Sequence, residues 1–207
     1  MTDILTFDER AHRYEINSTE VPSVTQICAQ LSLEAAIAGA QRPHLRDIAA
    51  NRGTRVHAYC ELIDMDIEPE NVDFDCVGYV EAYKAFRRDY RPKDIAAMEL
   101  PIGSLTLGAA GTLDRMMLID GNWWLIDIKT GTTVDKVIWT AQLNGYDAII
   151  AMPDCTTANL PIPNGLAILQ LGRRGQYNFR QMPFSNIFNM LMDIERERSN
   201  IKQWRAQ

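Results

Sequence analysis

Three charged residues on two nearby segments are the side chains best suited to chemistry in this chain of 207 residues. Asp114 ends the run Gly-Thr-Leu-Asp, while Asp127 and Lys129 enclose the run Asp-Ile-Lys. Two carboxylates brought together in an apolar sheet repel each other, and a bound divalent cation converts that repulsion into a binding site. Oxygen ligands select Mg²⁺ or Mn²⁺, which polarise a phosphate oxygen and lower the pKa of a bound water. Because a neighbouring ammonium group stabilises charge developing on phosphorus, the residue types suit phosphodiester hydrolysis.

The dipeptide Asp120-Gly121 predicts how these residues are positioned, since it is typical of two-residue β-hairpin loops. If it forms the loop, position 114 falls directly opposite position 127, with Cβ atoms about 4.5–5.5 Å apart. Lys129 follows Asp127 by two residues and therefore points to the same face of the strand. The Ile128 carbonyl group, between the two side chains, is a further candidate ligand.

A cross-strand Asp–Lys ion pair with only a structural role stays open as the alternative for this segment alone. Two further groups bear on that choice. His57 and Glu61 stand four residues apart, on one face of a predicted helix. Gln142 and Tyr146 have the same spacing on the helix predicted after Lys129. A zinc site is not expected around His57, because neither His-Glu-x-x-His nor paired cysteines accompany it.

Hydrophobic periodicity predicts the elements that must hold these residues. A short hairpin is expected over residues 3–17. Helices are expected over 23–33 with Ser23 as the cap, and over 43–64, 73–90, 135–152 and 186–204. Strands are expected over 97–107, 109–119, 122–129, 164–171 and 176–182. The strand over 122–129 is apolar on both faces and therefore central. This order predicts a single α/β domain over 1–207, with His57 in an N-terminal part (1–95) and the sheet in a core (96–207).

Composition restricts the class of protein. Hydrophobic residues make up 46% and the net charge is −6, which counts against simple electrostatic binding of nucleic acid without excluding it. Arginines nevertheless gather locally, at 42, 46, 52 and 55, at 87, 88 and 91, and at 173 and 174, although solvated surface arginines remain the alternative for each group. The four cysteines form no Cys-x-x-Cys pair, and we see no signal peptide or membrane span, so a reduced cytoplasmic protein is expected.

Taken together, these segments resemble the PD-(D/E)XK nuclease superfamily, and within it the RecB-like/Cas4-like branch that includes stand-alone phage exonucleases. The order of motifs in that branch is a helical histidine, G-x-x-D, D/E-x-K and Q-x-x-x-Y. Here it reads His57, Gly111 to Asp114, Asp127 to Lys129, and Gln142 to Tyr146. The opening is also similar to that of phage members, with Phe7-Asp8-Glu9, His12, Tyr14 and Pro22-Ser23-Val24-Thr25.

The resemblance implies a restriction-endonuclease-like core, a mixed central sheet with an antiparallel hairpin at about 109–129 flanked by helices. It implies His57, Asp114, Asp127 and the Ile128 carbonyl as ligands of Mg²⁺ or Mn²⁺, and Lys129 as the catalytic lysine. Gln142 and Tyr146 would position that lysine or contact DNA phosphates. Glu61 matches less firmly and would serve a second metal through water. Glu99, at the start of a strand, is expected to be structural.

The leading hypothesis is therefore a metal-dependent DNA exonuclease of phage-type recombination, replication or repair, in the host cytoplasm if phage-encoded. Cysteines for an iron–sulfur cluster and a G-x-x-x-x-G-K-[ST] loop for ATP are both absent from the sequence. By analogy, the partners are DNA ends or single strands and a single-strand-annealing or single-strand-binding protein, with no membrane. A structure-specific or nicking endonuclease of the same fold, and a DNA-end-binding module without turnover, remain the alternatives.

Overall fold

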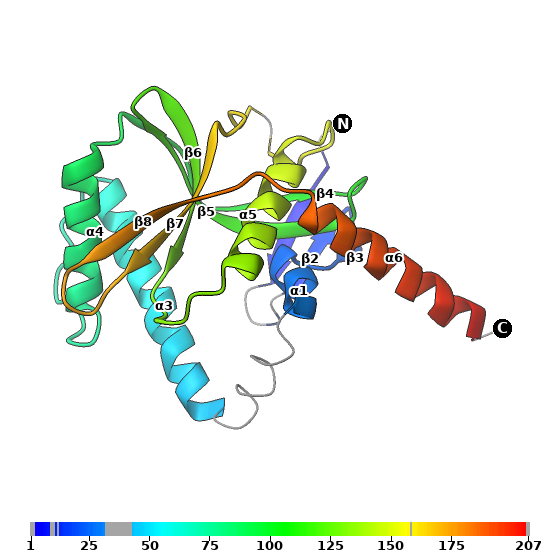
Figure 1. Cartoon of the computed structure of the whole chain (residues 1–207), viewed down its shortest axis with the longest axis horizontal. Coiled ribbons are helices and arrows are strands. Elements are labelled where there is room, and N and C mark those ends of the chain that lie inside the picture. The colour runs from blue at the N-terminus through cyan, green and yellow to red at the C-terminus, as the bar shows by residue number, and fades with distance from the viewer. Residues whose placement is uncertain (1–2, 9–10, 12, 32–42, 158, 206–207) are drawn as a thin grey trace.

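A mixed five-stranded sheet forms the centre of the molecule (Figure 1). Its strands stand in chain order: β4 (Asp94–Ser104), β5 (Ala109–Ile119), β6 (Asn122–Lys129), β7 (Gly165–Leu171) and β8 (Tyr177–Met182). Neighbouring strands are antiparallel except β6 and β7, which are parallel. Helix α5 (Lys136–Ile150) connects these two strands, since parallel neighbours require a crossover. The predicted α/β architecture, with a mixed sheet and an antiparallel hairpin over 109–129, is confirmed.

The computed structural model describes residues 3–8, 11, 13–31, 43–157 and 159–205. Glu9, His12, Arg42 and the end of the helix predicted over 23–33 lie outside the described residues. None of the described helices combines the length and the apolar character that a bilayer-spanning helix needs.

The β5–β6 hairpin turns at Asp120 and Gly121, as its sequence predicts. Both residues have positive φ, 49° and 78°, which is the backbone conformation that a type I′ turn requires. Pairing runs outward from Ile119 opposite Asn122 to Arg115 opposite Ile126. The next position in this register places residue 114 opposite residue 127.

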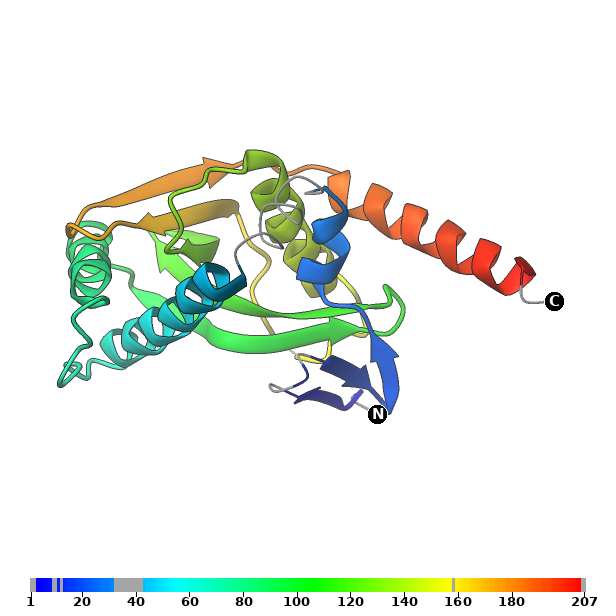
Figure 2. The same ribbon diagram turned by 90° about the horizontal axis from the view of Figure 1, so that it is seen from below.

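Helices cover both faces of the sheet (Figure 1). α1 (Val24–Cys28), α5 and α6 (Ile187–Arg205) pack with Leu125 of β6 in one apolar cluster. α3 (Pro43–Asp64) and α4 (Val77–Tyr90) pack with Ile126 and Ile128 in a second cluster. Alternate residues of β6 therefore enter different cores, which confirms that this strand is central and covered. The far end of α6 projects away from the body (Figure 2).

The N-terminal segment forms a small three-stranded sheet rather than the predicted two-stranded hairpin. Its strands are β1 (Leu5–Asp8), β2 (Arg13–Ile16) and β3 (Thr19–Val21), and the turn between β2 and β3 uses positive φ at Asn17 and Ser18. Figure 2 shows this sheet beside the β4–β5 hairpin. The Tyr14 hydroxyl is hydrogen-bonded to the Thr112 hydroxyl at 2.9 Å, which ties the small sheet to β5 two residues before Asp114.

Several predicted boundaries were wrong. The helix capped by Ser23 has the expected capping box with Gln26, but it ends at Cys28 and continues as a 3₁₀ turn, η1 (Ala29–Leu31). The helix predicted from residue 73 begins at Val77, because residues 73–76 form a turn closed by the Cys76 amide on the Asp73 carbonyl. β4 begins three residues earlier than predicted and ends at Ser104.

Candidate active site

One cavity of about 620 Å³ collects all of the residues that the sequence singled out. Residues 142 and 146 of α5, residues 53–61 of α3 and the strands β4 to β6 surround it. The predicted residues that line it are His57, Glu61, Glu99, Asp114, Asp127, Ile128, Lys129, Gln142 and Tyr146. We call it the active cavity. These segments meet at one cavity, and the roles of the residues remain predictions.

Asp114 and Asp127 are buried in adjacent strands, at 9% and 2% exposure. The Asp114 carboxylate reaches across to β6, where Oδ2 accepts a hydrogen bond of 2.6 Å from the Ile128 amide. Burial raises the pKa of Asp114 to about 7, which the positive charge of His57 opposes and the charges of Asp127 and Glu99 reinforce. Asp127 Oδ2 is buried and, among the described residues, accepts no hydrogen bond of regular geometry. The sheet thus holds two carboxylates with acceptor capacity to spare.

His57 enters the cavity from α3 and lies close to residues of three strands, β4, β5 and β6. Its Nδ1 lies 2.9 Å from Glu99 Oε1 and 3.8 Å from Asp114 Oδ2, and its Nε2 lies 3.2 Å from the Ile128 carbonyl oxygen. Both ring nitrogens face acceptors only, so both must donate and the ring is an imidazolium. Burial lowers the pKa of His57, but the carboxylates of Asp114, Glu99 and Asp127 outweigh it and raise the pKa to about 9. A proton on His57 balances the carboxylates around it.

Glu99 takes a larger part in the cluster than the sequence suggested. Nitrogen and oxygen atoms of His57, Glu99 and Asp114 all lie within 4.8 Å of one another. Glu99 lies inside β4, between the pairs Met98–Arg115 and Leu100–Leu113 and therefore opposite Asp114, with a φ of 41°. Burial raises its pKa, but the His57 and Arg115 cations lower it further, so the net shift is downward. The register of the β4–β5 hairpin would have indicated that Glu99 lies opposite Asp114, but this register depends on the position of the loop 105–108.

Lys129 lies beside Asp127. Its ammonium is 2.7 Å from Asp127 Oδ2 and donates a hydrogen bond of 2.9 Å to Gln142 Oε1. Gln142 Nε2 in turn donates to the Tyr146 hydroxyl at 3.2 Å. Burial lowers the pKa of Lys129, yet the charges of Asp127 and Asp114 raise it overall, so the amine stays protonated. Gln142 therefore contacts the lysine directly from α5, and Tyr146 contacts Gln142.

Glu61 lines the cavity one helical turn beyond His57 but stands apart from the other acidic groups. Within the part of the chain that the structure describes, its carboxylate makes no hydrogen bond or ion pair. We call the group His57, Glu99, Asp114, Asp127 and Lys129 the acidic cluster. Glu61 does not belong to it.

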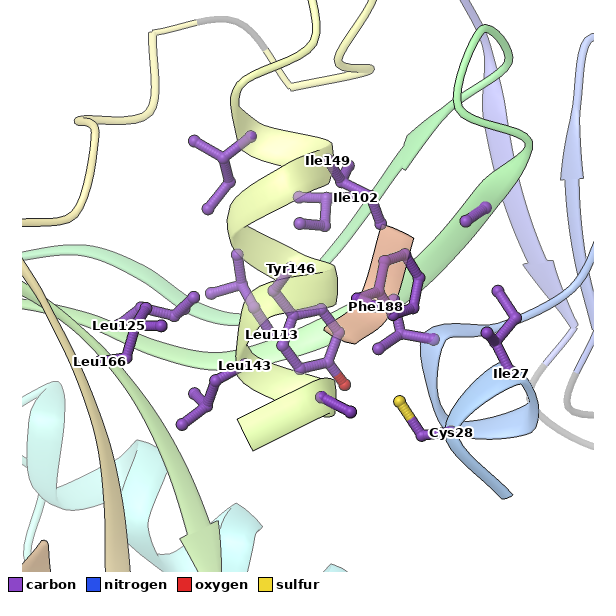
Figure 3. Packing of buried hydrophobic residues seen from close by; sticks show 14 of the residues in the cluster. Ile27, Cys28, Ile102, Leu113, Leu125, Leu143, Tyr146, Ile149, Leu166 and Phe188 are labelled. Carbon is purple, nitrogen blue, oxygen red and sulfur yellow. The ribbon is translucent and has the colours of Figure 1, made fainter. Parts of the chain in front are cut away.

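Two glycines allow close packing of α5, Gly111 where it meets strand β5 and Gly145 where it meets α1 and α6. A Cβ atom on Gly111 would lie 2.8 Å from a ring carbon of Tyr146, and one on Gly145 would lie 2.7 Å from Val24 and 2.8 Å from Phe188. Figure 3 shows Tyr146 packed with Leu113 and Phe188 in this cluster. The glycine of the run Gly-Thr-Leu-Asp therefore makes room for the tyrosine that supports Gln142 and Lys129.

A second charged group lies behind the acidic cluster and was not recognised in the sequence. Arg115 is fully buried and donates to Asp64 Oδ2 at 2.6 Å and to Glu99 Oε1 at 2.7 Å. Asp64 also accepts a hydrogen bond of 2.6 Å from the Tyr83 hydroxyl and one from Arg87. We call Asp64, Tyr83, Arg87 and Arg115 the buried ion-pair network. The one signal was an arginine inside an otherwise apolar strand, since a buried cation needs partners.

No family model matches this chain, and no curated protein matches it.

Proposed function

We propose that this protein is a Mg²⁺- or Mn²⁺-dependent deoxyribonuclease with a restriction-endonuclease-like core, acting as an exonuclease. One observation carries the proposal. Four segments that follow one another along 90 residues of sequence, from His57 to Tyr146, supply donor atoms to a single cavity, and the lysine of the set is held beside the carboxylates by Gln142. An Asp–Lys ion pair with only a structural role would not require His57 and Glu99 to meet there as well.

The donor set fits a divalent cation. Two ligands of one Mg²⁺ ion are at most about 4.2 Å apart, since each bond is about 2.1 Å. The three donor atoms of His57, Glu99 and Asp114, within 4.8 Å of one another, need only a small contraction to share an ion. The Ile128 carbonyl and Oδ2 of Asp127, which lies beside the Lys129 ammonium, complete an oxygen-rich set, and the imidazole favours Mn²⁺ over Mg²⁺.

His57 and Lys129 have separate tasks in this proposal. A cation bound here would polarise a phosphate oxygen and generate hydroxide from water at neutral pH. His57 must give up the proton that it holds against the Ile128 carbonyl before its Nε2 is free to serve as a ligand. Lys129 keeps its proton and donates to an oxygen of the scissile phosphate or of the attacking water, which stabilises negative charge. Gln142 fixes the direction of that ammonium group.

The test is cleavage of linear DNA in Mg²⁺ or Mn²⁺ by the wild type, Asp114→Asn and Lys129→Ala. Matched controls are Asp193→Asn and Lys93→Ala, both on exposed side chains remote from the cavity. We expect Lys129→Ala to lose about 10²–10³-fold in rate, as for removal of one transition-state donor, and the controls to lose none. Equal rates in all variants would disprove the proposal. Activity on covalently closed circular DNA would replace the exonuclease with an endonuclease, because an exonuclease needs an end.

A partner that binds or anneals single strands remains an expectation from the resemblance. The described surface neither requires nor opposes it.

A further inference from the structure

A second, smaller cavity of about 240 Å³ has a basic rim. Arg173 and Arg174 on the turn between β7 and β8 form one side of it, and Tyr79 of α4 forms another. Thr130 and Thr132, which follow β6, supply two hydroxyl groups. We call it the basic cavity.

The basic cavity adjoins the active cavity. Lys129 lines the active cavity, and the next residue, Thr130, lines the basic one. On α3, Gly53 lines the active cavity, while the Arg52 guanidinium lies over the Tyr79 ring at 5.3 Å. A Cβ on Gly53 would lie 3.6 Å from the Thr130 hydroxyl. Gly53 and Thr130 thus lie close together where residues of the two cavities adjoin.

The arginines at the basic cavity have no counter-ions within the described residues. Arg55, Arg87 and Arg115 each pair with a carboxylate at the buried or partly buried sites that they occupy. By contrast, no described carboxylate pairs with Arg52, Arg173 or Arg174, and the Arg52 Nε is buried with no hydrogen-bond partner in the described part of the chain. Arg173 and Arg174 line the basic cavity, and Arg52 lies over the Tyr79 ring at its side. In a protein with a net charge of −6, such a local group of positive charges favours an external anion.

The turn that carries two of these arginines is held in place before any ligand binds. The Gly172 amide donates to the Gln176 carbonyl at 2.8 Å, and Gly175 has a φ of 80°. Gly78 of α4 packs against the turn so closely that a Cβ there would lie 1.8 Å from the Arg173 carbonyl oxygen. Because the backbone is supported on both sides, little ordering is needed when the guanidinium groups engage a ligand.

We propose that the basic cavity binds a backbone phosphate of the DNA strand whose scissile phosphate occupies the active cavity. This inference rests on the proposed nuclease function and names a contact outside the reacting centre. Guanidinium groups match phosphate with paired hydrogen bonds, and the hydroxyls of Thr130 and Thr132 add neutral donors. The site grips the strand without reading its bases, since phosphate contacts carry no sequence information.

The test compares Arg173→Ala/Arg174→Ala with Arg196→Ala/Arg198→Ala. The control removes the same charge from α6, which lines neither cavity. Binding of a fluorescein-labelled single-stranded 20-mer is measured by anisotropy at several salt concentrations, in EDTA so that no cleavage occurs. We expect the first variant to bind about 10-fold more weakly, with a log–log salt slope smaller by about 0.7–1.4. Lysine at both positions should restore most of the slope.

Equal affinities and slopes for the two double variants would overturn the inference. Its failure is distinguishable from that of the proposed function, because binding is measured without cleavage. If the wild type cleaves DNA and Arg173→Ala/Arg174→Ala keeps its KM for a 20-mer, the basic cavity is excluded and the nuclease stands. If the variant has a higher KM for the 20-mer and no longer prefers the 20-mer to a dinucleotide as substrate, the inference is supported. If DNA binding depends on these arginines but the wild type does not cleave DNA, the phosphate site is supported and the nuclease function is rejected.

Discussion

The acidic cluster and the buried ion-pair network meet at Glu99 and differ in how completely their charges are matched. In the network, Asp64 accepts from Tyr83, Arg87 and Arg115, and it lies out of contact with solvent. In the acidic cluster, Glu99 is shared between His57 and Arg115, whereas Asp114, Asp127 and the Ile128 carbonyl have only His57 and Lys129 as cationic neighbours. Asp127 Oδ2 accepts no regular hydrogen bond within the described residues.

This difference separates charges that hold the fold from charges that await a ligand. Removing one member of a fully paired buried group is destabilising, because the remaining charge is left unmatched in a poorly solvated site. A group of carboxylates with spare acceptor capacity, open to a cavity, is stabilised by a cation instead. The two clusters should therefore respond in opposite ways to mutation and to metal.

The largest effect is expected in the acidic cluster, on activity. Asp114→Asn removes a proposed ligand and should lower the rate of DNA cleavage by at least about 10³-fold. It also removes one of several mutually repelling carboxylates, so we expect the free energy of unfolding to stay the same or to rise. Cleavage assays and urea unfolding on the same preparation measure both quantities. A variant that unfolds more easily and retains activity would reverse the comparison.

Removing a charge from the buried network should instead damage stability. Asp64→Ala leaves Arg115 and Arg87 without their shared carboxylate, and we expect a loss of about 3–5 kcal/mol in the free energy of unfolding. Asp193→Ala, at an exposed site on α6, is the matched control and should change it by less than about 0.5 kcal/mol. A loss below 1 kcal/mol for Asp64→Ala, by urea denaturation, would mean that the network is dispensable.

Metal and pH should act on the acidic cluster together. His57 has a pKa raised from 6.5 to about 9, so its contribution to stability is present below pH 6.5 and is lost as pH rises through about 9. The pKa of Asp114, raised from 3.8 to about 7, changes stability in the same direction at lower pH. In EDTA, stability should therefore fall between pH 6 and 8.

Mn²⁺ should reverse that trend. Its ligands must be deprotonated, so stabilisation by the metal grows with pH, and at 100 times the Kd it amounts to about 2.7 kcal/mol. Thermal unfolding at pH 6, 7 and 8 measures the gap in stability between the protein with Mn²⁺ and the protein without it. In His57→Gln, the stabilisation by Mn²⁺ should increase less with pH than in the wild type. A gap independent of pH in the wild type would exclude His57 as a ligand.

The smallest effect concerns the packing that connects the sheet to Lys129. Gly111→Ala places a methyl group against the Tyr146 ring and should reduce stability by about 1–3 kcal/mol. Cleavage should fall as well, since Tyr146 supports Gln142 and Gln142 supports Lys129. Gly131→Ala is the control, because a Cβ there meets nothing within 4 Å. Equal stability of the two variants would show that α5 adjusts freely.

Much of the site was predictable from local sequence. Asp120-Gly121 determined the turn, the turn determined the register, and the register placed Asp114 across from Asp127. The β-strand period of two then placed Lys129 on the side of Asp127 and sent Ile126 and Ile128 to the opposite core. The helical spacing of Gln142 and Tyr146 predicted their common face. Each of these inferences spans few residues, so local geometry was sufficient.

What the sequence could not determine depends on contacts between distant segments. The short α1 and the third N-terminal strand reflect packing of the 14–24 region against β5, which overrides local propensity. Glu99 joined the acidic cluster because the β4–β5 register placed it opposite Asp114. The pairing of Arg115 with Asp64 across 51 positions, and the approach of Arg173 to Thr130, have no periodic signal at all. Sequence alone determined the chemical types and the hairpin, because those are local properties; tertiary packing decided which charges are matched and which remain open to a ligand.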